Sequence, residues 1–264
     1  YAGGVGPRGN PVATGLVRDA DLILALGTRL GFNTARFTSE IVTPRSRIVQ
    51  VDIDPLAIGR YYPVALGMAA DPKTTLAELA SALHTRMGET ERRAAAARVE
   101  KIGKARVDVM ARVRAAAEAE TERTPIGQAH LMRTLASLLP RDAVVVDESA
   151  TSLPFVLRYV PFSTPGSFFG GKTGTLGWGM GAAIGVQLGS PGRKVVATIG
   201  DGSLMYAPQA LWTAAHYRLP ITYVVPNNSS YAILKSGMLS LDLASAKRGI
   251  YPGMDLVEPA IDYV

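Results

Sequence analysis

The chain has 264 residues, 47% of them hydrophobic, which is enough apolar material for two ordinary globular domains. Its arginines are spread along the chain, and many interleave with alanine and glutamate between Glu89 and Arg123, so the net charge of +6 favours solvated helix faces over a nucleic-acid surface. The absence of cysteine excludes disulfides and thiolate chemistry, and the lack of a long apolar run or a signal-like start predicts a soluble, cytoplasmic protein without membrane contact.

The first part of the chain alternates apolar runs with helical stretches. Residues 21–27 and 47–54 are short apolar runs that stop at glycine or aspartate, which is typical of buried parallel strands in a βαβ arrangement. Residues 76–87 predict an amphipathic helix that closes this part. Alanine, arginine and glutamate dominate residues 89–123, so we expect a helical connector there that cannot form a core alone.

A second domain is predicted to begin near Pro125, because Thr124 offers a helix N-cap followed by proline in the first turn. Strands that alternate with helices predict a doubly wound α/β fold for this domain. The expected elements are helix 126–138, strand 143–147, strand 194–199, helix 208–217 and strand 221–225.

Polar residues follow two of these strands directly. Asp201 lies between Gly200 and Gly202 after one strand, and Asn228 follows the next. The carboxyl ends of neighbouring parallel strands meet at one crevice, which is where open α/β sheets bind ligands. A carboxylate and an amide oxygen are hard donors that suit Mg²⁺, and the helix after Ser203 would add free amides and its positive end to an anion. Either half alone is a common turn or loop, but together they predict a site for an anionic ligand and its metal ion.

This pattern resembles the fingerprint of the thiamine-diphosphate-dependent decarboxylase and acetolactate synthase superfamily, and it looks most like the benzoylformate decarboxylases. The resemblance implies an α/β protein with two doubly wound parallel-sheet domains. Residues 1–88 would be part of a Rossmann-like middle domain, residues 89–123 the connector, and residues 124–264 a thiamine-diphosphate-binding domain truncated at its C-terminus. The segments that carry it are 165–169, 176–188 and 210–215, with 19–27 and 51–55 for the middle domain.

The resemblance assigns roles to individual residues. Asp201 and Asn228 would bind Mg²⁺ through their side chains and Ser230 through its carbonyl. Leu176 would be the apolar wedge that bends the cofactor, and the Gly174 carbonyl would receive the aminopyrimidine, which brings the reacting atoms of the cofactor together. The remaining residues implied to contact the cofactor, most of them at its diphosphate, are Ser149, Thr151, Gly200, Gly202, Ser203, Tyr231 and Ala232.

Three positions depart from the family pattern. Ala150 replaces a hydroxyl residue, for which Ser149 or Thr151 could compensate. Ala232 replaces a glycine and Gly237 an aromatic residue of the substrate pocket. These departures put benzoylformate itself in doubt as the substrate.

The resemblance implies non-oxidative decarboxylation of a 2-oxo acid, with thiamine diphosphate and Mg²⁺ as cofactors. In this superfamily, the glutamate that activates the cofactor comes from an N-terminal, pyrimidine-binding domain of another subunit. We therefore expect a fragment or a split protein whose missing domain or subunit completes the site, and a homodimer or homotetramer in the natural context.

Several alternatives stay open at this point. One is an acetolactate synthase-like carboligase, and another is a non-catalytic module that only binds cofactor or a partner. His84, His130 and His216 fall on predicted helices without partners at metal spacing, and no nucleophile elbow is present, so hydrolysis fits poorly. A dinucleotide-binding protein fits poorly too, because no glycine-rich fingerprint opens a helix after a strand.

Overall fold

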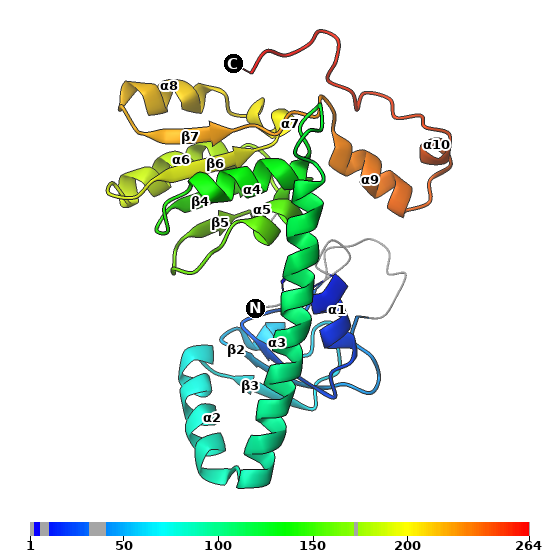
Figure 1. Cartoon of the computed structure of the whole chain (residues 1–264), viewed down its shortest axis with the longest axis vertical. Helices are drawn as coiled ribbons and strands as arrows, with labels where there is room; N and C mark the ends of the chain where they lie inside the picture. Colours follow the sequence, from blue (N-terminus) through cyan, green and yellow to red (C-terminus); the bar gives the residue numbers. More distant parts are fainter. Residues whose placement is uncertain (1–2, 6–10, 32–40, 172–173, 264) are drawn as a thin grey trace. The chain divides into compact units, whose positions relative to one another are not determined.

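The computed structural model describes residues 3–5, 11–31, 41–171 and 174–263. The chain forms two compact units, Tyr1–Arg112 and Val113–Val264. Each unit contains its own parallel β-sheet flanked by helices (Figure 1). The predicted α/β class with two parallel sheets is therefore confirmed.

The first unit contains a three-stranded parallel sheet in the order β1-β2-β3, built from β1 (Leu22–Leu26), β2 (Arg47–Asp52) and β3 (Leu66–Ala69). The sequence pattern indicated β1 and β2 but not β3, a four-residue strand interrupted by glycine. Strand β2 is largely buried as expected, whereas β1 exposes 56% of Leu22. The other elements before the connector are α1 (Pro11–Arg18), the 3-10 helix η1 (Pro55–Ala57) and α2 (Pro72–Arg86).

Helix α2 begins four residues earlier than residue 76, because the side chain of Asp71 caps the amide of Thr74 at 2.9 Å and Pro72 occupies the first turn. No residue of α2 is buried, so the amphipathic packing expected for it is not found. Helix α3 (Glu89–Glu118) matches the predicted helical stretch and buries only Ala117 among its residues. Ion pairs one turn apart, such as Arg93 with Glu89 at 3.1 Å, support this solvated helix.

The second unit contains a four-stranded parallel sheet in the order β5-β4-β6-β7. Its strands are β4 (Val144–Glu148), β5 (Phe168–Gly170), β6 (Val195–Ile199) and β7 (Ile221–Val224). The chain runs outward from β4 to β5 and then returns past β4 to β6. The winding direction reverses between β4 and β6, which makes the carboxyl ends of these two strands the topological switch point of the sheet.

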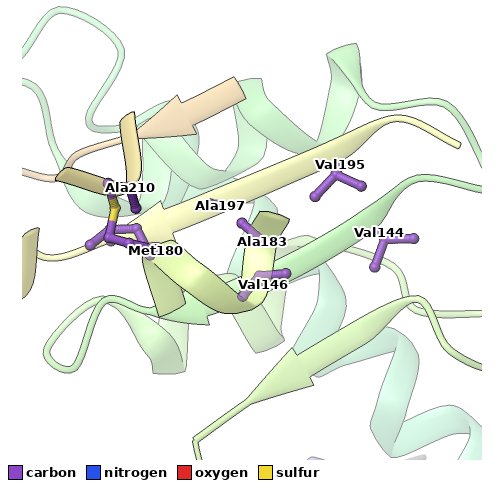
Figure 2. Close-up of a cluster of buried hydrophobic side chains, with 8 residues drawn as sticks. Val144, Val146, Met180, Ala183, Val195, Ala197 and Ala210 are labelled. Carbon is purple, nitrogen blue, oxygen red and sulfur yellow. The ribbon is translucent and has the colours of Figure 1, made fainter. Parts of the chain in front are cut away.

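Helices pack on both faces of this sheet. On one face, Val144 and Val146 of β4 pack with Val195 and Ala197 of β6 against α6 and α8, through Met180, Ala183 and Ala210 (Figure 2). On the other face, Val145 of β4 packs against Met132 of α4, Val156 of α5 and Val160 directly after α5. The alternation along β4 follows from the two-residue period of a strand. The helices of this unit are α4 (Gln128–Leu138), α5 (Leu153–Tyr159), α6 (Trp178–Gly189), α7 (Asp201–Leu204), α8 (Gln209–His216), α9 (Ala232–Ser240) and α10 (Ala244–Lys247).

The predicted N-cap at Thr124 is wrong. Helix α4 begins at Gln128 with Gly127 at the cap position, and no side chain of the cap residue itself bonds to the helix. Instead, the carboxylate of Glu120 accepts hydrogen bonds from the amides of Ala129 at 2.9 Å and His130 at 3.3 Å. A glutamate from outside the helix thus replaces the local cap that the sequence suggested. Within the described residues, none of the helices combines the length and apolar character needed to cross a membrane.

Candidate functional site

A crevice opens at the switch point of the second sheet, with about 410 Å³ of open space including its mouth. Its walls come from the ends of β4, β6 and β7, from the loop before α6, and from the start of α9. Ten of the predicted site residues line it, and Gly174 and Ala232 do not. The lining residues are Ser149, Ala150, Thr151, Leu176, Gly200, Asp201, Gly202, Ser203, Pro226, Asn228, Ser230, Tyr231 and Ile233.

The predicted convergence of Asp201 and Asn228 is confirmed. Asp201 is 3% exposed, and its carboxylate accepts a hydrogen bond from the backbone amide of Asn228 at 3.2 Å. The turn after Asn228 is fixed by Asn227, whose side-chain oxygen accepts from the amide of Ser229 at 2.9 Å. Ser229 adopts a left-handed backbone with a φ of 51°. Asp201 and Asn228 thus lie together at the crevice although 27 residues separate them in the sequence.

A later segment holds the loop that carries Ser230. The carbonyl of Met254 accepts hydrogen bonds from the Ser230 hydroxyl at 3.0 Å and from the Tyr231 amide at 2.9 Å. The amide of Leu256 donates to the carbonyl of Ser229 at 2.7 Å. Because the Ser230 hydroxyl already has a partner, the arrangement is compatible with the predicted use of the Ser230 carbonyl as a ligand.

The two glycines around Asp201 differ in their surroundings. A Cβ atom on Gly202 would lie 2.6 Å from Cε1 of the Tyr231 ring, so only glycine fits this position without a shift. A Cβ atom on Gly200 would meet its nearest neighbour at 3.6 Å, which is ordinary contact. The helix after Gly200 is a single short turn, α7, and α8 begins separately at Gln209. The turn has amides at its start, but it is too short to carry the macrodipole behind the positive helix end that we expected after Ser203.

Asp147 is a buried carboxylate that sequence reasoning missed. It accepts hydrogen bonds from the hydroxyl of Thr198 at 2.6 Å and from the hydroxyl of Ser149 at 2.7 Å. Burial raises the pKa of Asp147 above its ordinary value, and the bonds from Ser149 and Thr198 oppose that rise. The Ser149 hydroxyl thus already donates a hydrogen bond to Asp147.

Glu148, the next residue of β4, was also missed. It is 6% exposed, and its two carboxylate oxygens accept hydrogen bonds from the amides of Gly177 and Gly179, each at 2.5 Å. Burial raises the pKa of Glu148, while the amides of Gly179 and Gly177 and the hydroxyl of Ser203 act in the opposite direction. The partners lie about thirty residues away in sequence. No local pattern at the end of β4 could therefore have revealed them.

Of the three remaining predicted residues, Leu176, Gly174 and Ala232, only Leu176 lines the crevice. Leu176 is also 39% exposed, so it is not a core residue. Gly174 has a φ of 72°. Ala232 is the first residue of α9. Sequence reasoning did not single out Pro226 and Ile233 as site residues.

The predicted metal ligands do not include a cluster of acids. Among the residues that the structure describes, no group of three or more histidines, cysteines or acids gathers at a spacing suited to a metal. A cation at the crevice would rest on the carboxylate of Asp201 together with amide and carbonyl oxygens. The three histidines lie on α2, α4 and α8 as expected, and none of them lines the crevice.

Comparison with known proteins identifies the family of the chain. The family model described as "Thiamine pyrophosphate enzyme, C-terminal TPP binding domain" matches residues 150–262, and the one described as "Thiamine pyrophosphate enzyme, central domain" matches residues 1–79. The chain belongs to the thiamine pyrophosphate enzymes, with regions of the central and the C-terminal type.

Individual relatives include both decarboxylases and synthases. Benzoylformate decarboxylase of Pseudomonas aeruginosa is 39% identical over 48% of this chain and 24% of its own length. "Probable 2-ketoarginine decarboxylase AruI" of the same species is 32% identical over 86% of this chain and 38% of its own length. The acetolactate synthase large subunit of Haemophilus influenzae is 27% identical over 89% of this chain and 40% of its own length. The chain thus spans between a quarter and two fifths of these relatives.

The solved structures show the same fold. Benzoylformate decarboxylase of Polynucleobacter necessarius superposes with a TM-score of 0.70 at 23% identity, covering 96% of this chain and 43% of the other. At this identity the likeness concerns the fold alone.

Proposed function

We propose that this chain anchors thiamine diphosphate through Mg²⁺ for the non-oxidative decarboxylation of a 2-oxo acid. The observation that carries the proposal is the meeting of Asp201 and Asn228 at the switch point of the second sheet, beside a glycine that no larger residue could replace without a shift. The donor set fits a hard divalent cation, since it consists of carboxylate, amide and carbonyl oxygens. The bound cofactor would supply the electron sink that decarboxylation requires.

Each wall of the crevice has a separate task in this proposal. Asp201, Asn228 and the carbonyl of Ser230 would hold Mg²⁺, which would offset the negative charge of the diphosphate. The amides of Gly202 and Ser203, and the hydroxyl of Thr151, would bind the diphosphate oxygens directly. Leu176, as the apolar wedge, and Gly174, through its carbonyl, would orient the ring end of the cofactor, with Tyr231 and Ala232 nearby.

The activating carboxylate is proposed to come from a separate pyrimidine-binding domain or subunit. Asp201 is assigned to the ion, and Glu148 already accepts two amide hydrogen bonds, so both carboxylates have other tasks. A homodimer or homotetramer, as inferred from the family resemblance, would bring such a domain to each crevice. The cytoplasmic location expected from the sequence stays a prediction.

Carboligation of the acetolactate synthase type is the second candidate. It is favoured by the similarity to an acetolactate synthase subunit across 89% of this chain. The two reactions differ in the second reactant, which is a proton in decarboxylation and a second 2-oxo acid in carboligation. Product analysis of the natural gene product with single and paired 2-oxo acids distinguishes an aldehyde from a hydroxy-oxo acid.

Calorimetry tests the cofactor site directly. The natural gene product is expected to bind thiamine diphosphate only in the presence of Mg²⁺, and Asp201→Ala should abolish detectable binding. Asp108→Ala on the exposed face of α3 is a matched control and should bind as the wild type does. Wild-type affinity in Asp201→Ala would overturn the proposed site. Cofactor binding without turnover of any 2-oxo acid would instead support a non-catalytic module.

A further inference from the structure

Glu148 joins three segments that meet at the switch point. It ends strand β4, and its carboxylate binds the amides of Gly177 and Gly179 at the beginning of α6. Its backbone carbonyl accepts a hydrogen bond from the amide of Gly200 at 3.2 Å, directly before Asp201. Glu148 therefore touches both the charged side and the apolar side of the crevice without lining it.

We propose that Glu148 is a positioning residue that holds Leu176 in place at the crevice by binding the backbone immediately after it. The inference rests on the proposed function, because Leu176 is there the wedge that orients the cofactor. Helix α6 has no side-chain cap of its own, since its N-cap residue is Gly177. The carboxylate of Glu148 supplies that cap from a neighbouring strand, and it fixes two amides that are otherwise free at a helix start.

The glycines around Leu176 make this contact specific. Gly177 has a φ of 89°, a left-handed backbone that redirects the chain directly after Leu176. A Cβ atom on Gly179 would lie 2.8 Å from both Cβ and Oε2 of Glu148, so the helix can approach the carboxylate only because residue 179 lacks a side chain. The backbone on the C-terminal side of Leu176 is thus set by one side chain and two glycines.

Leu176 depends on this cap more than a core residue would. Its side chain is 39% exposed and lines the open space of the crevice, so packing fixes its position less tightly than that of a core residue. If one amide loses its acceptor, the turn at Gly177 is free to open, and Leu176 would move relative to Asp201. Glu148 reaches the ion and diphosphate side through its backbone carbonyl, which a Glu148→Gln substitution leaves unchanged, and through the Ser203 hydroxyl, which the remaining side-chain oxygen of a glutamine could still accept, so that side would keep its place.

Two ligands separate these effects in the natural gene product with Mg²⁺. Thiamine diphosphate reaches the whole crevice, whereas inorganic pyrophosphate reaches only the anion site. Glu148→Gln replaces one acceptor oxygen with a donor, so we expect about tenfold weaker binding of thiamine diphosphate by calorimetry. Pyrophosphate binding should change by less than about twofold, because the amides of Gly202 and Ser203 remain in place and the backbone carbonyl of Glu148, which holds Gly200, is unchanged by the substitution.

Glu120→Gln is a matched control, because Glu120 also caps two amides at the start of a helix, α4, away from the crevice. It should lower stability similarly but leave the ratio of the two affinities unchanged. In a double-mutant cycle, Leu176→Ala should add little to Glu148→Gln, since both changes remove the same contact with the ring end. Independent, additive effects would overturn the proposal.

The proposal would also be overturned if Glu148→Gln left the ratio of the affinities for thiamine diphosphate and pyrophosphate unchanged. Should that variant not fold, Gly179→Ala presses on the same carboxylate and must give the same change of ratio. If the wild type binds neither ligand, the proposed function fails separately. Amide exchange then still tests the cap, because exchange at Gly177 and Gly179 should be faster in Glu148→Gln than in the wild type. Unchanged exchange would contradict it.

Discussion

The two glycines that flank Asp201 make the same contribution to the sequence pattern but should respond differently to mutation. In Gly202→Ala, the added methyl group would lie 2.6 Å from Cε1 and 3.0 Å from Cδ1 of the Tyr231 ring. Carbon atoms prefer a separation of about 3.5–4.0 Å, so the ring must move by roughly 1 Å. Overpacking of this kind costs about 1–3 kcal/mol, and the loss of chain entropy in the unfolded state offsets roughly 0.4–1 kcal/mol of it.

The displaced ring also carries a functional consequence. Tyr231 directly follows Ser230 and is tied through its amide to Met254. A shift of the ring therefore pulls on the loop that would present the Ser230 carbonyl to the metal ion. We expect the net loss of unfolding free energy in Gly202→Ala to be about 1–2 kcal/mol, with a weaker affinity for thiamine diphosphate and Mg²⁺.

Gly200→Ala is the matched comparison within the same turn. Its added methyl group would meet Ser203, Glu148 and Ser149 at 3.6–3.8 Å, and Gly200 has an extended backbone that alanine adopts without strain. The free energy of unfolding, measured by urea denaturation, should therefore stay within about 0.5 kcal/mol of the wild type or rise. The reasoning is refuted if Gly200→Ala is the more destabilising of the two, or if Gly202→Ala is as stable as the wild type with unchanged cofactor affinity.

Three further predictions concern the crevice and its supports. Leu176→Ala should lower the free energy of unfolding by only about 1 kcal/mol, because the side chain is 39% exposed. It should nevertheless weaken cofactor binding, and a folded variant with wild-type affinity in calorimetry would contradict this. Thr151→Ala should weaken pyrophosphate binding about tenfold, whereas Ser149→Ala should mainly lower the free energy of unfolding, by about 1 kcal/mol. If Ser149→Ala instead weakened pyrophosphate binding and Thr151→Ala did not, Ser149 would be the diphosphate ligand. Burial raises the native pKa of Asp147 above 3.8, so the stability of the wild type relative to Asp147→Asn should be greatest below that pH and fall as the pH rises through the native pKa. Urea unfolding between about pH 3.5 and pH 7 measures this, and a difference that grows with pH would contradict it.

The sequence predicted the parts of the fold that have strong local patterns. Four of the seven strands in the described residues lie in the second sheet, and the three apolar ones, β4, β6 and β7, were expected within one or two residues. Strand β5 was missed because Phe168–Gly170 is three residues long and ends in glycine. Its strand conformation depends on pairing with β4, which a local pattern does not reveal.

The candidate site was predictable where it follows strand ends and unpredictable where it depends on distant partners. Asp201 and Asn228 each follow an apolar strand, so topology alone brings them to one edge of the sheet. Asp147 and Glu148 stand at a strand end too, but their roles depend on Thr198 and on Gly177, which no spacing rule connects to them. The cap at α4 failed for the same reason, since a glutamate from outside the helix supplies it.

Two consecutive carboxylates at the end of β4, Asp147 and Glu148, hold two different walls of the crevice in place. Neighbouring residues of a strand point to opposite faces, so Asp147 and Glu148 reach different loops from adjacent positions. Asp147 fixes the turn that leads to Thr151, and Glu148 fixes the backbone after Leu176. Both walls are already hydrogen-bonded within the chain. The loops would therefore lose little further conformational entropy when a ligand binds. Substitutions at the wall residues that face the ligand should therefore change affinity, whereas substitutions at their two supports should change affinity and stability together.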